Sequence, residues 1–363
     1  MKKQIPDIYN TITQKLLCRF AADGDKNVVL SPLSVLVLLG MLADATGSGT
    51  REEIAKALGY GDHAEEIIEW LASAQRDLME SGALISSNAV CIREELKDRI
   101  APGYEEHLRQ VFDGRLFTAK AMANAVNEWV NEKTKGMIPQ IADESVNAAL
   151  ACLMNAIAFE AKWDQKYESD DIEPGEFNNS DGTCNEVTMM RSNERHYIED
   201  AHFTGFTKPY KEAGYSFMAL LPKKEDPAYL RRALEQVNLT KLFHGRKTEK
   251  VLTFIPEYTL ESGGELKEFS ESLGIRQVFT GDADFSPMTD AWLKVQRIIH
   301  KAKIRVDRNG TKAVAATIAV MYAGCVPDFD YRIVELDRPF VFAIVHDGTG
   351  LPVFAGVVNH LED

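Results

Sequence analysis

The chain has 363 residues, of which 45% are hydrophobic and 26% are charged, and its formal net charge at pH 7 is -14. This composition is typical of a soluble globular protein, and the negative charge argues against nucleic acid or an anionic membrane as a partner, because both attract positive charge. The sequence contains no basic cluster that would indicate a glycosaminoglycan site and no apolar run long enough to cross a bilayer.

Helical patterns dominate the first part of the chain. Ser31 and Pro32 supply an N-cap followed by proline at the first helical position. Thr50 and Glu53 have the spacing of a capping box, and Gly59 would end that helix. Periodicity and caps together predict helices at about 8–20, 32–43, 50–58, 64–79, 104–111 and 122–133, and strands at 28–30 and 89–93.

Strand patterns dominate the second part. Residues 146–159 are almost entirely apolar, and periodicity alone does not separate a strand buried on both faces from a buried helix. Further strands are expected at 186–190, 195–208, 215–221, 251–258, 295–306, 331–345 and 353–358, with helices at 227–236 and 264–273. Such a mixture predicts an α+β fold.

The cysteines and the N-terminus say little about the compartment. The cysteines are odd in number, widely spaced and without a Cys-x-x-Cys pair, which predicts free thiols and neither a disulfide framework nor a metal site; they are Cys18, Cys91, Cys152, Cys184 and Cys325. The first seven residues lack the apolar core of a signal peptide. We therefore expect a secreted or cell-surface protein if a leader has been removed, and a cytoplasmic protein otherwise.

Enzyme signatures are missing from the sequence. It contains no Gly-x-Ser-x-Gly elbow, Ser-x-x-Lys, His-Glu-x-x-His or phosphate-loop pattern. The closest pair of histidines, His196 and His202, lies in a predicted strand region, where such residues are more often surface or core side chains than metal ligands. We therefore expect that the protein is not an enzyme and that it binds no metal and no cofactor.

The stretch from Asp307 to Tyr322 is compatible with two conformations. Its alanines favour a helix that would be entered from Gly310 and Thr311. In an extended chain, the small residues at alternate positions from Thr311 to Ala319 would instead share one face. Taken alone, a buried alanine-rich helix or an edge strand would be the ordinary explanation.

Several motifs, in the same order along almost the whole chain, resemble those of the serpin family. They are Asn-Val-Val-Leu-Ser-Pro-Leu-Ser at 27–34, Asn-Glu-Trp-Val-Asn-Glu-Lys-Thr-Lys-Gly-Met-Ile at 127–138, Asn-Ala-Ile-Ala-Phe-Glu-Ala-Lys-Trp at 155–163, Gly-Thr-Lys-Ala-Val-Ala-Ala-Thr at 310–317, Arg-Pro-Phe-Val-Phe at 338–342 and Pro-Val-Phe-Ala-Gly at 352–356. We expect a prokaryotic-type member of the family.

The resemblance implies both a fold and a mechanism. The fold is the serpin fold of three β-sheets and about nine helices, here one domain over residues 1–363 with an exposed reactive-centre loop at about 308–330. The mechanism is that of a suicide substrate: a protease cleaves the loop and is held as an acyl-enzyme while the loop inserts as a new strand of the central sheet. Small residues on the inserting face would let the strand enter without overpacking.

The loop residues follow from the family's counting, in which Gly310 is the fifteenth residue before the cut. The scissile bond then lies between Gly324 and Cys325. Because glycine gives a protease pocket nothing to hold, a shift in register is expected, with Met321, Tyr322, Ala323 and Val326 as further candidates. The segment that the family calls the hinge corresponds to Arg308, Gly310, Thr311, Ala313, Ala315, Ala316 and Thr317.

Two other groups also come from the resemblance. The shutter, a buried polar cluster beneath the central sheet, corresponds to Ser31, Ser34, Asn155 and His300. The breach, where insertion begins, corresponds to Trp163 and Glu257. The family usually has a glutamate at the position of Arg308 and a lysine at that of Glu257. Because this chain reverses both signs, we expect an Arg308–Glu257 ion pair.

These residues predict a monomeric inhibitor of a serine protease. No lysine or arginine occurs between Ala313 and Tyr331, which disfavours a trypsin-like target. Small and apolar residues favour an elastase-like protease, with a chymotrypsin-like one as the second possibility. The alternative is a non-inhibitory serpin that acts as a binding or chaperone-like protein. Proline, charge or bulk on the inserting face would favour that alternative, and the face holds only threonine and alanine.

Overall fold

The structure is a computed structural model that describes residues 5–61, 64–311 and 331–362. Contacts divide the chain into two compact units. Unit 1 comprises Met1–Pro32, Phe159–Ser262 and Lys303–Asp363, and unit 2 comprises Leu33–Ala158 and Gly263–Ala302. The α+β class is confirmed, with nine α-helices and three sheets among the described residues. The expectation of a single domain stays a prediction.

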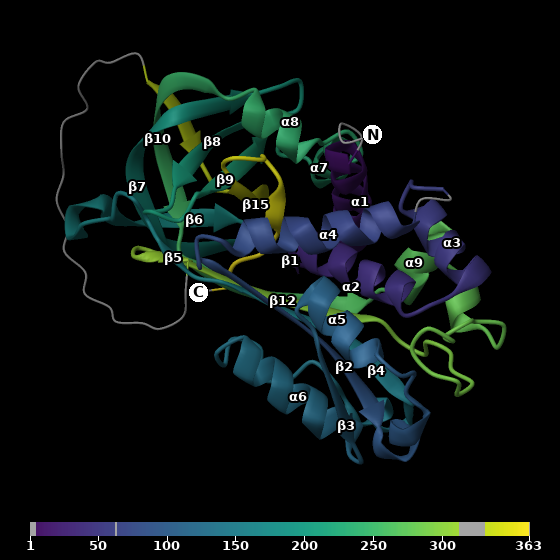
Figure 1. Ribbon diagram of the computed structural model, residues 1–363. Coiled ribbons are helices and arrows are strands. Elements are labelled where there is room, and N and C mark those ends of the chain that lie inside the picture. Colours follow the sequence, from purple (N-terminus) through teal and green to yellow (C-terminus); the bar gives the residue numbers. More distant parts are fainter. Residues whose placement is uncertain (1–4, 62–63, 312–330, 363) are drawn as a thin grey trace. The chain divides into compact units, whose positions relative to one another are not determined.

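Unit 1 is built on a nine-stranded sheet (Figure 1). Its strand order is β1-β16-β15-β9-β8-β7-β10-β14, with β6 paired to β7. Neighbours are antiparallel except β10 and β14, which are parallel. The strands are β1 (Val28–Leu30), β6 (Ile172–Asn178), β7 (Cys184–Glu199), β8 (Phe203–Pro209), β9 (Tyr215–Pro222), β10 (Lys247–Pro256), β14 (Arg332–Glu335), β15 (Phe340–His346) and β16 (Pro352–Val358).

Three helices accompany this sheet: α1 (Ile5–Phe20), α7 (Pro227–Leu234) and α8 (Leu239–His244). The helix α1 contacts α7, α8, β1 and β16, while α7 also contacts β9, and α8 also contacts β7 and β15. The strands β9 and β16 are buried at every position, which explains their continuous apolar sequences, because a strand covered on both faces does not alternate.

A second sheet has the order β11-β12-β13-β5. Its strands are β11 (Tyr258–Glu265), β12 (Ile299–Asp307), β13 (Gly310–Thr311) and β5 (Ala161–Lys162). β11 and β12 each have residues in both units, whereas β13 and β5 belong to unit 1.

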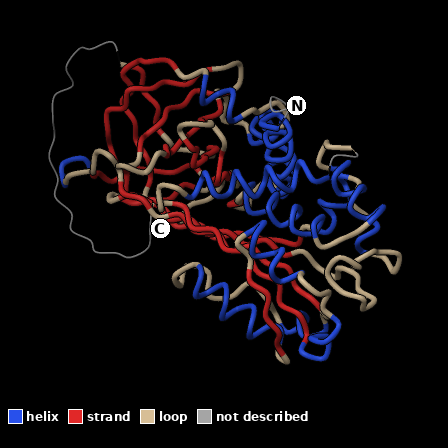
Figure 2. Tube along the Cα trace, viewed as in Figure 1, coloured by secondary structure: helices blue, strands red, loops and turns tan. Residues whose placement is uncertain are grey.

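Unit 2 contains most of the helical residues, drawn in blue in Figure 2. Its helices are α2 (Pro32–Asp44), α3 (Ser48–Ala57), α4 (Ala64–Met79), α5 (Tyr104–Phe112), α6 (Met122–Lys133) and α9 (Lys267–Leu273). Its sheet has the order β3-β2-β4, with β2 (Leu84–Arg93), β3 (Arg115–Ala119) and β4 (Ala151–Phe159). Apolar side chains of α6, including Trp129 and Val126, pack with Cys91 of β2 and Met154 of β4 in one buried cluster.

Most predicted elements are present, and the differences have local causes. Periodicity left the apolar run 146–159 open between a strand and a helix, and the family resemblance favours a strand. Its beginning instead lies in the 3₁₀ helix Glu144–Ala148, which Asp143 caps by accepting a hydrogen bond from the Ser145 backbone nitrogen. Residues 195–208 were expected as one strand, but the chain turns there. Asp200 Oδ1 accepts hydrogen bonds from the backbone nitrogens of His202 and Phe203 and so separates β7 from β8.

Other boundaries also shift. Residues 295–298 precede β12 and are not part of it, β11 extends into the predicted start of α9, and residues 331–345 form two strands. The short helix α8 was not predicted, although Asn238 caps it. The remaining 3₁₀ helices are Ala21–Asp23, Glu94–Arg99, Ser169–Asp171 and Gln277–Phe279. In the described ranges, no helix is both long and apolar enough to span a membrane.

The capping box predicted for Thr50 and Glu53 is wrong. The helix α3 begins earlier, and its N-cap is Gly47. Thr50 Oγ1 accepts a hydrogen bond from the Asp284 backbone nitrogen at 3.1 Å. Glu53 Oε1 accepts two, from the backbone nitrogens of Arg276 and Gln277 at 2.6 and 2.7 Å. Both side chains therefore satisfy backbone donors of a distant segment and not those of their own helix.

Candidate functional site

Two residues near the start of the predicted loop, Gly310 and Thr311, form a strand of the second sheet. The chain reverses after β12, and β13 then runs antiparallel beside it, with Val306 opposite Thr311 and Asp307 opposite Gly310. On its other side β13 pairs with β5, with Thr311 opposite Ala161. Thr311 is 2% exposed. The expectation of an exposed loop from residue 308 onward is therefore wrong for Thr311, because this residue already occupies a strand position.

Gly310 has a geometric reason to be glycine. Its φ is +152°, a conformation that side-chain-bearing residues rarely adopt. A Cβ atom placed there would lie 2.2 Å from the Ala161 carbonyl oxygen and 2.7 Å from the Lys162 Cα. Because backbone atoms cannot move aside cheaply, only glycine lets β13 approach β5 this closely.

Trp163 holds the turn between β12 and β13. Its indole nitrogen donates a hydrogen bond to the Asp307 carbonyl oxygen at 2.8 Å, and its backbone nitrogen donates to Asn309 at 3.1 Å. The indole is fully buried and stacks on Tyr210, with ring centroids 4.6 Å apart and planes inclined by 10°. The Tyr210 hydroxyl lies 2.6 Å from Thr311 Oγ1. One aromatic pair thus contacts both the turn and the strand that follows it.

Arg308 and Glu257 form the expected contact. Arg308 Nε lies 3.1 Å from Glu257 Oε1, and the backbone nitrogen of Arg308 donates to the same oxygen at 3.1 Å. Both side chains are about one quarter exposed, at 24% and 26%. The ion pair inferred from the reversed charges is present, and its effect on the loop stays a prediction.

A buried ion pair lies next to Trp163, and no sequence motif indicated it. Lys208 Nζ lies 2.8 Å from Glu194 Oε1, and the two side chains are 1% and 7% exposed. The ammonium also lies 5.5 Å from the Trp163 ring centroid and 4.4 Å from that of Tyr167. Ser192 Oγ donates to Glu194 Oε1 at 2.7 Å. Such a charge is tolerated in the interior because it is paired and hydrogen-bonded.

The predicted shutter residues fall in different units. Ser31 belongs to unit 1, where its hydroxyl donates to the Val353 carbonyl oxygen at 2.7 Å. Ser34, Asn155 and His300 belong to unit 2, and Ser34 and His300 are buried. The union of the four residues in one cluster stays a prediction.

Asn155 has partners that the sequence did not indicate. Its Nδ2 donates to Ser86 Oγ and to Asn88 Oδ1, both at 2.8 Å. Asn88 in turn donates to Gln75 Oε1 at 2.9 Å, and Gln75 donates to Ser86 at 3.0 Å. This closed set of amides and a hydroxyl satisfies buried polar groups of α4, β2 and β4. Within the described part of the chain, Asn155 Oδ1 is buried without a hydrogen-bond partner.

The other loop candidates lie outside the described residues. They are the hinge residues Ala313, Ala315, Ala316 and Thr317, and the residues around the expected reactive bond, Met321, Tyr322, Ala323, Gly324, Cys325 and Val326.

Comparisons with known proteins agree with this arrangement of elements. A family model described as "Serpin (serine protease inhibitor)" matches residues 7–361. Iripin-1 of Ixodes ricinus is 28% identical, over 97% of this chain and 93% of its own length. The leukocyte elastase inhibitor of Sus scrofa is 26% identical, over 91% of this chain and 92% of its own.

Solved structures are similar over the whole length. The thermophilic serpin tengpin in its native state has a TM-score of 0.84 and 29% identity, covering 98% of this chain and 94% of tengpin. Tengpin in its latent state has a TM-score of 0.82 and 27% identity, covering 98% of both chains. Thyroxine-binding globulin in complex with thyroxine has a TM-score of 0.88, covering 99% of this chain and 100% of its own, and at 23% identity it shows the likeness of the fold alone.

The buried His300 leads to a prediction of how the free energy of unfolding depends on pH. Burial lowers the pKa of this imidazole from 6.5 to about 4. In the unfolded chain the ring takes up a proton as the pH falls below 6.5, whereas the native ring stays neutral until about pH 4. The free energy of unfolding should therefore decrease as the pH falls from 6.5 to 4, by up to about 3 kcal/mol from this group.

Urea unfolding between pH 7 and pH 4 measures this contribution. His300→Gln should flatten the dependence on pH, and His244→Gln, at an exposed histidine, is the matched comparison. Equal slopes for the wild type and His300→Gln would show that His300 is not the titrating group.

Proposed function

Because the chain belongs to the serpin family, we propose that it inhibits a serine protease as a suicide substrate. Serpins are protease inhibitors and not enzymes, so the chain needs no catalytic residues of its own. In this proposal the protease cleaves within residues 312–330, and the freed hinge continues β13 along β12 while the protease remains attached as an acyl-enzyme. Strand addition of this kind is the known behaviour of serpin loops.

The observation that supports the proposal most is the position of β13. Because β13 pairs antiparallel with β12, each next residue of the loop lies opposite a residue one position earlier in β12. If this register continues, residue 317 comes to lie opposite His300. The register with β5, continued without a bulge into β4, brings the same residue opposite Asn155. Residue 317 is a threonine, whose hydroxyl could donate to the buried Asn155 Oδ1.

The energy available is sufficient for a large rearrangement. A strand of this length gains on the order of ten ladder hydrogen bonds, each contributing about 0.5–1.5 kcal/mol net. The sum is comparable with the stability of a whole domain, roughly 5–15 kcal/mol. The solved native and latent states of tengpin, a relative with the same fold, are consistent with two stable arrangements for one sequence.

The target is inferred from the residues around Gly324 and Cys325. Small and apolar side chains fit an elastase-like pocket, and Met321 or Tyr322 would fit a chymotrypsin-like one. The name of the leukocyte elastase inhibitor, one of the similar proteins, is consistent with the first choice. The missing lysine and arginine between Ala313 and Tyr331 argue against a trypsin-like enzyme.

A non-inhibitory serpin is the second candidate. Thyroxine-binding globulin, whose complex with thyroxine has this fold, illustrates that the fold alone does not decide between inhibition and binding. The inserting face of this chain favours inhibition, because it carries only threonine and alanine from Thr311 to Ala319, and buried small residues do not obstruct entry into a sheet.

Incubation with elastase and with chymotrypsin, followed by a denaturing gel, tests the proposal. We expect a band at the summed mass of the protein and the protease, and N-terminal sequencing should place the cut within residues 321–326. Ala315→Glu should instead be cleaved without forming this band, because the inserting strand would have to bury a carboxylate. Ala315→Ser serves as the matched control. Clean cleavage of the wild type by both proteases would favour the non-inhibitory candidate.

The Arg308–Glu257 ion pair predicts that reversing either charge alone impairs inhibition and that reversing both charges together restores it. Exposed ion pairs contribute only about 0–1 kcal/mol, so we expect an effect on the number of inhibitor molecules consumed per protease and little effect on folding. Arg308→Glu and Glu257→Lys should each raise that number by about two- to fivefold, since a coupling of at most about 1 kcal/mol corresponds to a factor of about five.

The double variant should return towards the wild-type value, and the double-mutant cycle measures the coupling. Strictly additive effects of the two substitutions would mean that the pair does not influence the loop.

A further inference from the structure

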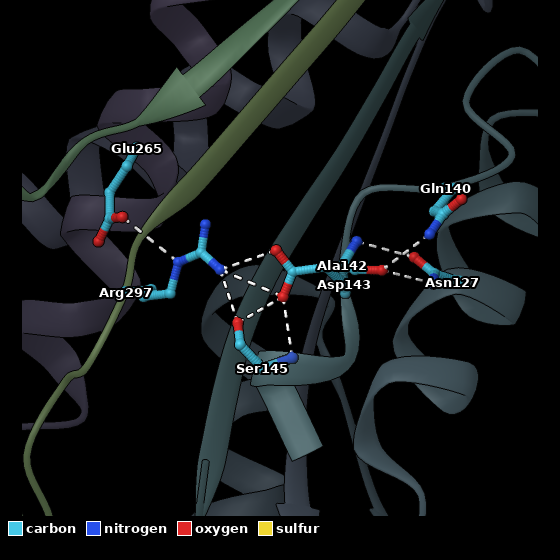
Figure 3. Close-up of polar contacts among 7 residues, drawn as sticks. All are labelled: Asn127, Gln140, Ala142, Asp143, Ser145, Glu265 and Arg297. Atoms are coloured by element: carbon cyan, nitrogen blue, oxygen red, sulfur yellow. Dashed lines mark hydrogen bonds and ion pairs between the residues drawn. The ribbon is translucent and has the colours of Figure 1, made fainter. Parts of the chain in front are cut away.

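The connection between α6 and β4 is fixed to α6 by one side chain. Asn127 Oδ1 accepts hydrogen bonds from the backbone nitrogens of Ile141 and Ala142 at 2.9 and 2.8 Å. Its Nδ2 donates to the Ala142 carbonyl oxygen at 2.8 Å (Figure 3). A single amide thus satisfies three backbone groups of residues 141–142, which holds this part of the connection in one conformation.

Arg297 ties the same connection to the segment that leads into β12. Its Nη1 lies 3.0 Å from Asp143 Oδ2 and donates to Ser145 Oγ at 2.7 Å (Figure 3). On the opposite side, its Nε lies 3.3 Å from Glu265 Oε2 at the end of β11. Lys301 Nζ adds a second tie, to the Gln140 carbonyl oxygen at 3.0 Å. Residues 140–145 are therefore attached to the 297–301 segment at two residues, Arg297 and Lys301, which are four positions apart.

A cavity of about 90 Å³ lies at this attachment. Its lining includes Ile141 and Ser145 of the connection, Met154 of β4, Arg297 just before β12, and Ile299 at the start of β12. The order β3-β2-β4 places β4 at an edge among the described strands of its sheet. The cavity thus lies between a strand edge on one side and the residues leading into β12 on the other, and the connection with its ties to Arg297 forms part of its wall.

We propose that Arg297 sets the rate of the later part of loop insertion, by holding the α6–β4 connection where the new strand must pass. The inference rests on the proposed function, since it concerns the insertion step of that mechanism. In the continued register, residue 316 reaches Lys301 and residue 320 reaches Arg297. Insertion beyond about residue 315 therefore requires the Lys301 tie to break, and insertion beyond about residue 319 requires the Arg297 tie to break, whereas the entry of Gly310 and Thr311 requires neither.

The chemistry of the tie predicts a dependence on salt. The Arg297 and Asp143 side chains are 36% and 62% exposed, and interactions between exposed charges are screened by dissolved ions. Salt should weaken the tie and so accelerate insertion in the wild type. Without the guanidinium group the rate should depend little on salt, which distinguishes an ionic restraint from a general loss of packing.

Annealing of a synthetic peptide isolates the insertion step from protease chemistry. The peptide has the sequence of residues 312–321, and its incorporation into the full-length protein is followed on native gels and by the gain in thermal stability. At low salt, Arg297→Gln and Asp143→Asn should anneal about three- to tenfold faster than the wild type. Asparagine keeps the ability to cap the 3₁₀ helix at residue 143. Arg297→Lys should restore part of the slow rate and part of its salt dependence.

The matched control is Arg99→Gln. Arg99 Nε lies 2.7 Å from Asp290 Oδ1 and its Nη2 donates to the Asp290 carbonyl oxygen, so this variant also loses an exposed arginine tie, but outside the cavity lining. It should anneal at the wild-type rate. A wild-type rate for Arg297→Gln, or equal acceleration by Arg99→Gln, would overturn the inference while leaving protease trapping intact. Failure of every variant and of the wild type to take up the peptide would overturn both proposals.

Discussion

The account depends on the close contact between β13 and β5. Gly310 can adopt its backbone conformation and approach Ala161 because it lacks a Cβ atom, and this approach lets Thr311 complete a two-sided pairing between β5 and β12. A strand that is paired on both sides at its first two residues is a nucleus for extension, because each further residue adds ladder hydrogen bonds without a new loop to close. Within the described residues, the site is thus the first two positions of a strand, each paired on both sides.

Polar groups around this nucleus keep it in place. Trp163 and Tyr210 bind the turn and Thr311 from one side, Glu257 binds Arg308 at the turn itself, and the buried Lys208–Glu194 pair supports the aromatic layer. Paired buried charges are costly to break and therefore favour one arrangement of the neighbouring rings. By contrast, the Asp143–Arg297 tie is exposed, and we infer that it can open during insertion.

The sequence predicted the features that motifs and local chemistry encode. Trp163, Glu257 and Arg308 were found because they belong to, or depart from, a recognisable pattern, and the long helices followed from periodicity. The Lys208–Glu194 pair was missed because residues 195–208 were interpreted as one strand. Recognition of the Asp200 turn would have placed these two residues on neighbouring strands of a hairpin. The roles of Thr50 and Glu53 were predicted wrongly for a simple reason. The sequence shows that these side chains can accept hydrogen bonds from backbone nitrogens, but not whether those nitrogens belong to their own helix.

The central claim is that the loop completes the strand that β13 begins. The most direct measurement compares the thermal unfolding of the intact protein with that of the protein cleaved once within residues 321–326, at the same pH and salt. If cleavage lets the loop insert, the added ladder should raise the midpoint of unfolding by at least about 10 °C. An unchanged or lower midpoint after cleavage would contradict the account, because a loop that stays outside the sheet adds no hydrogen bonds to it.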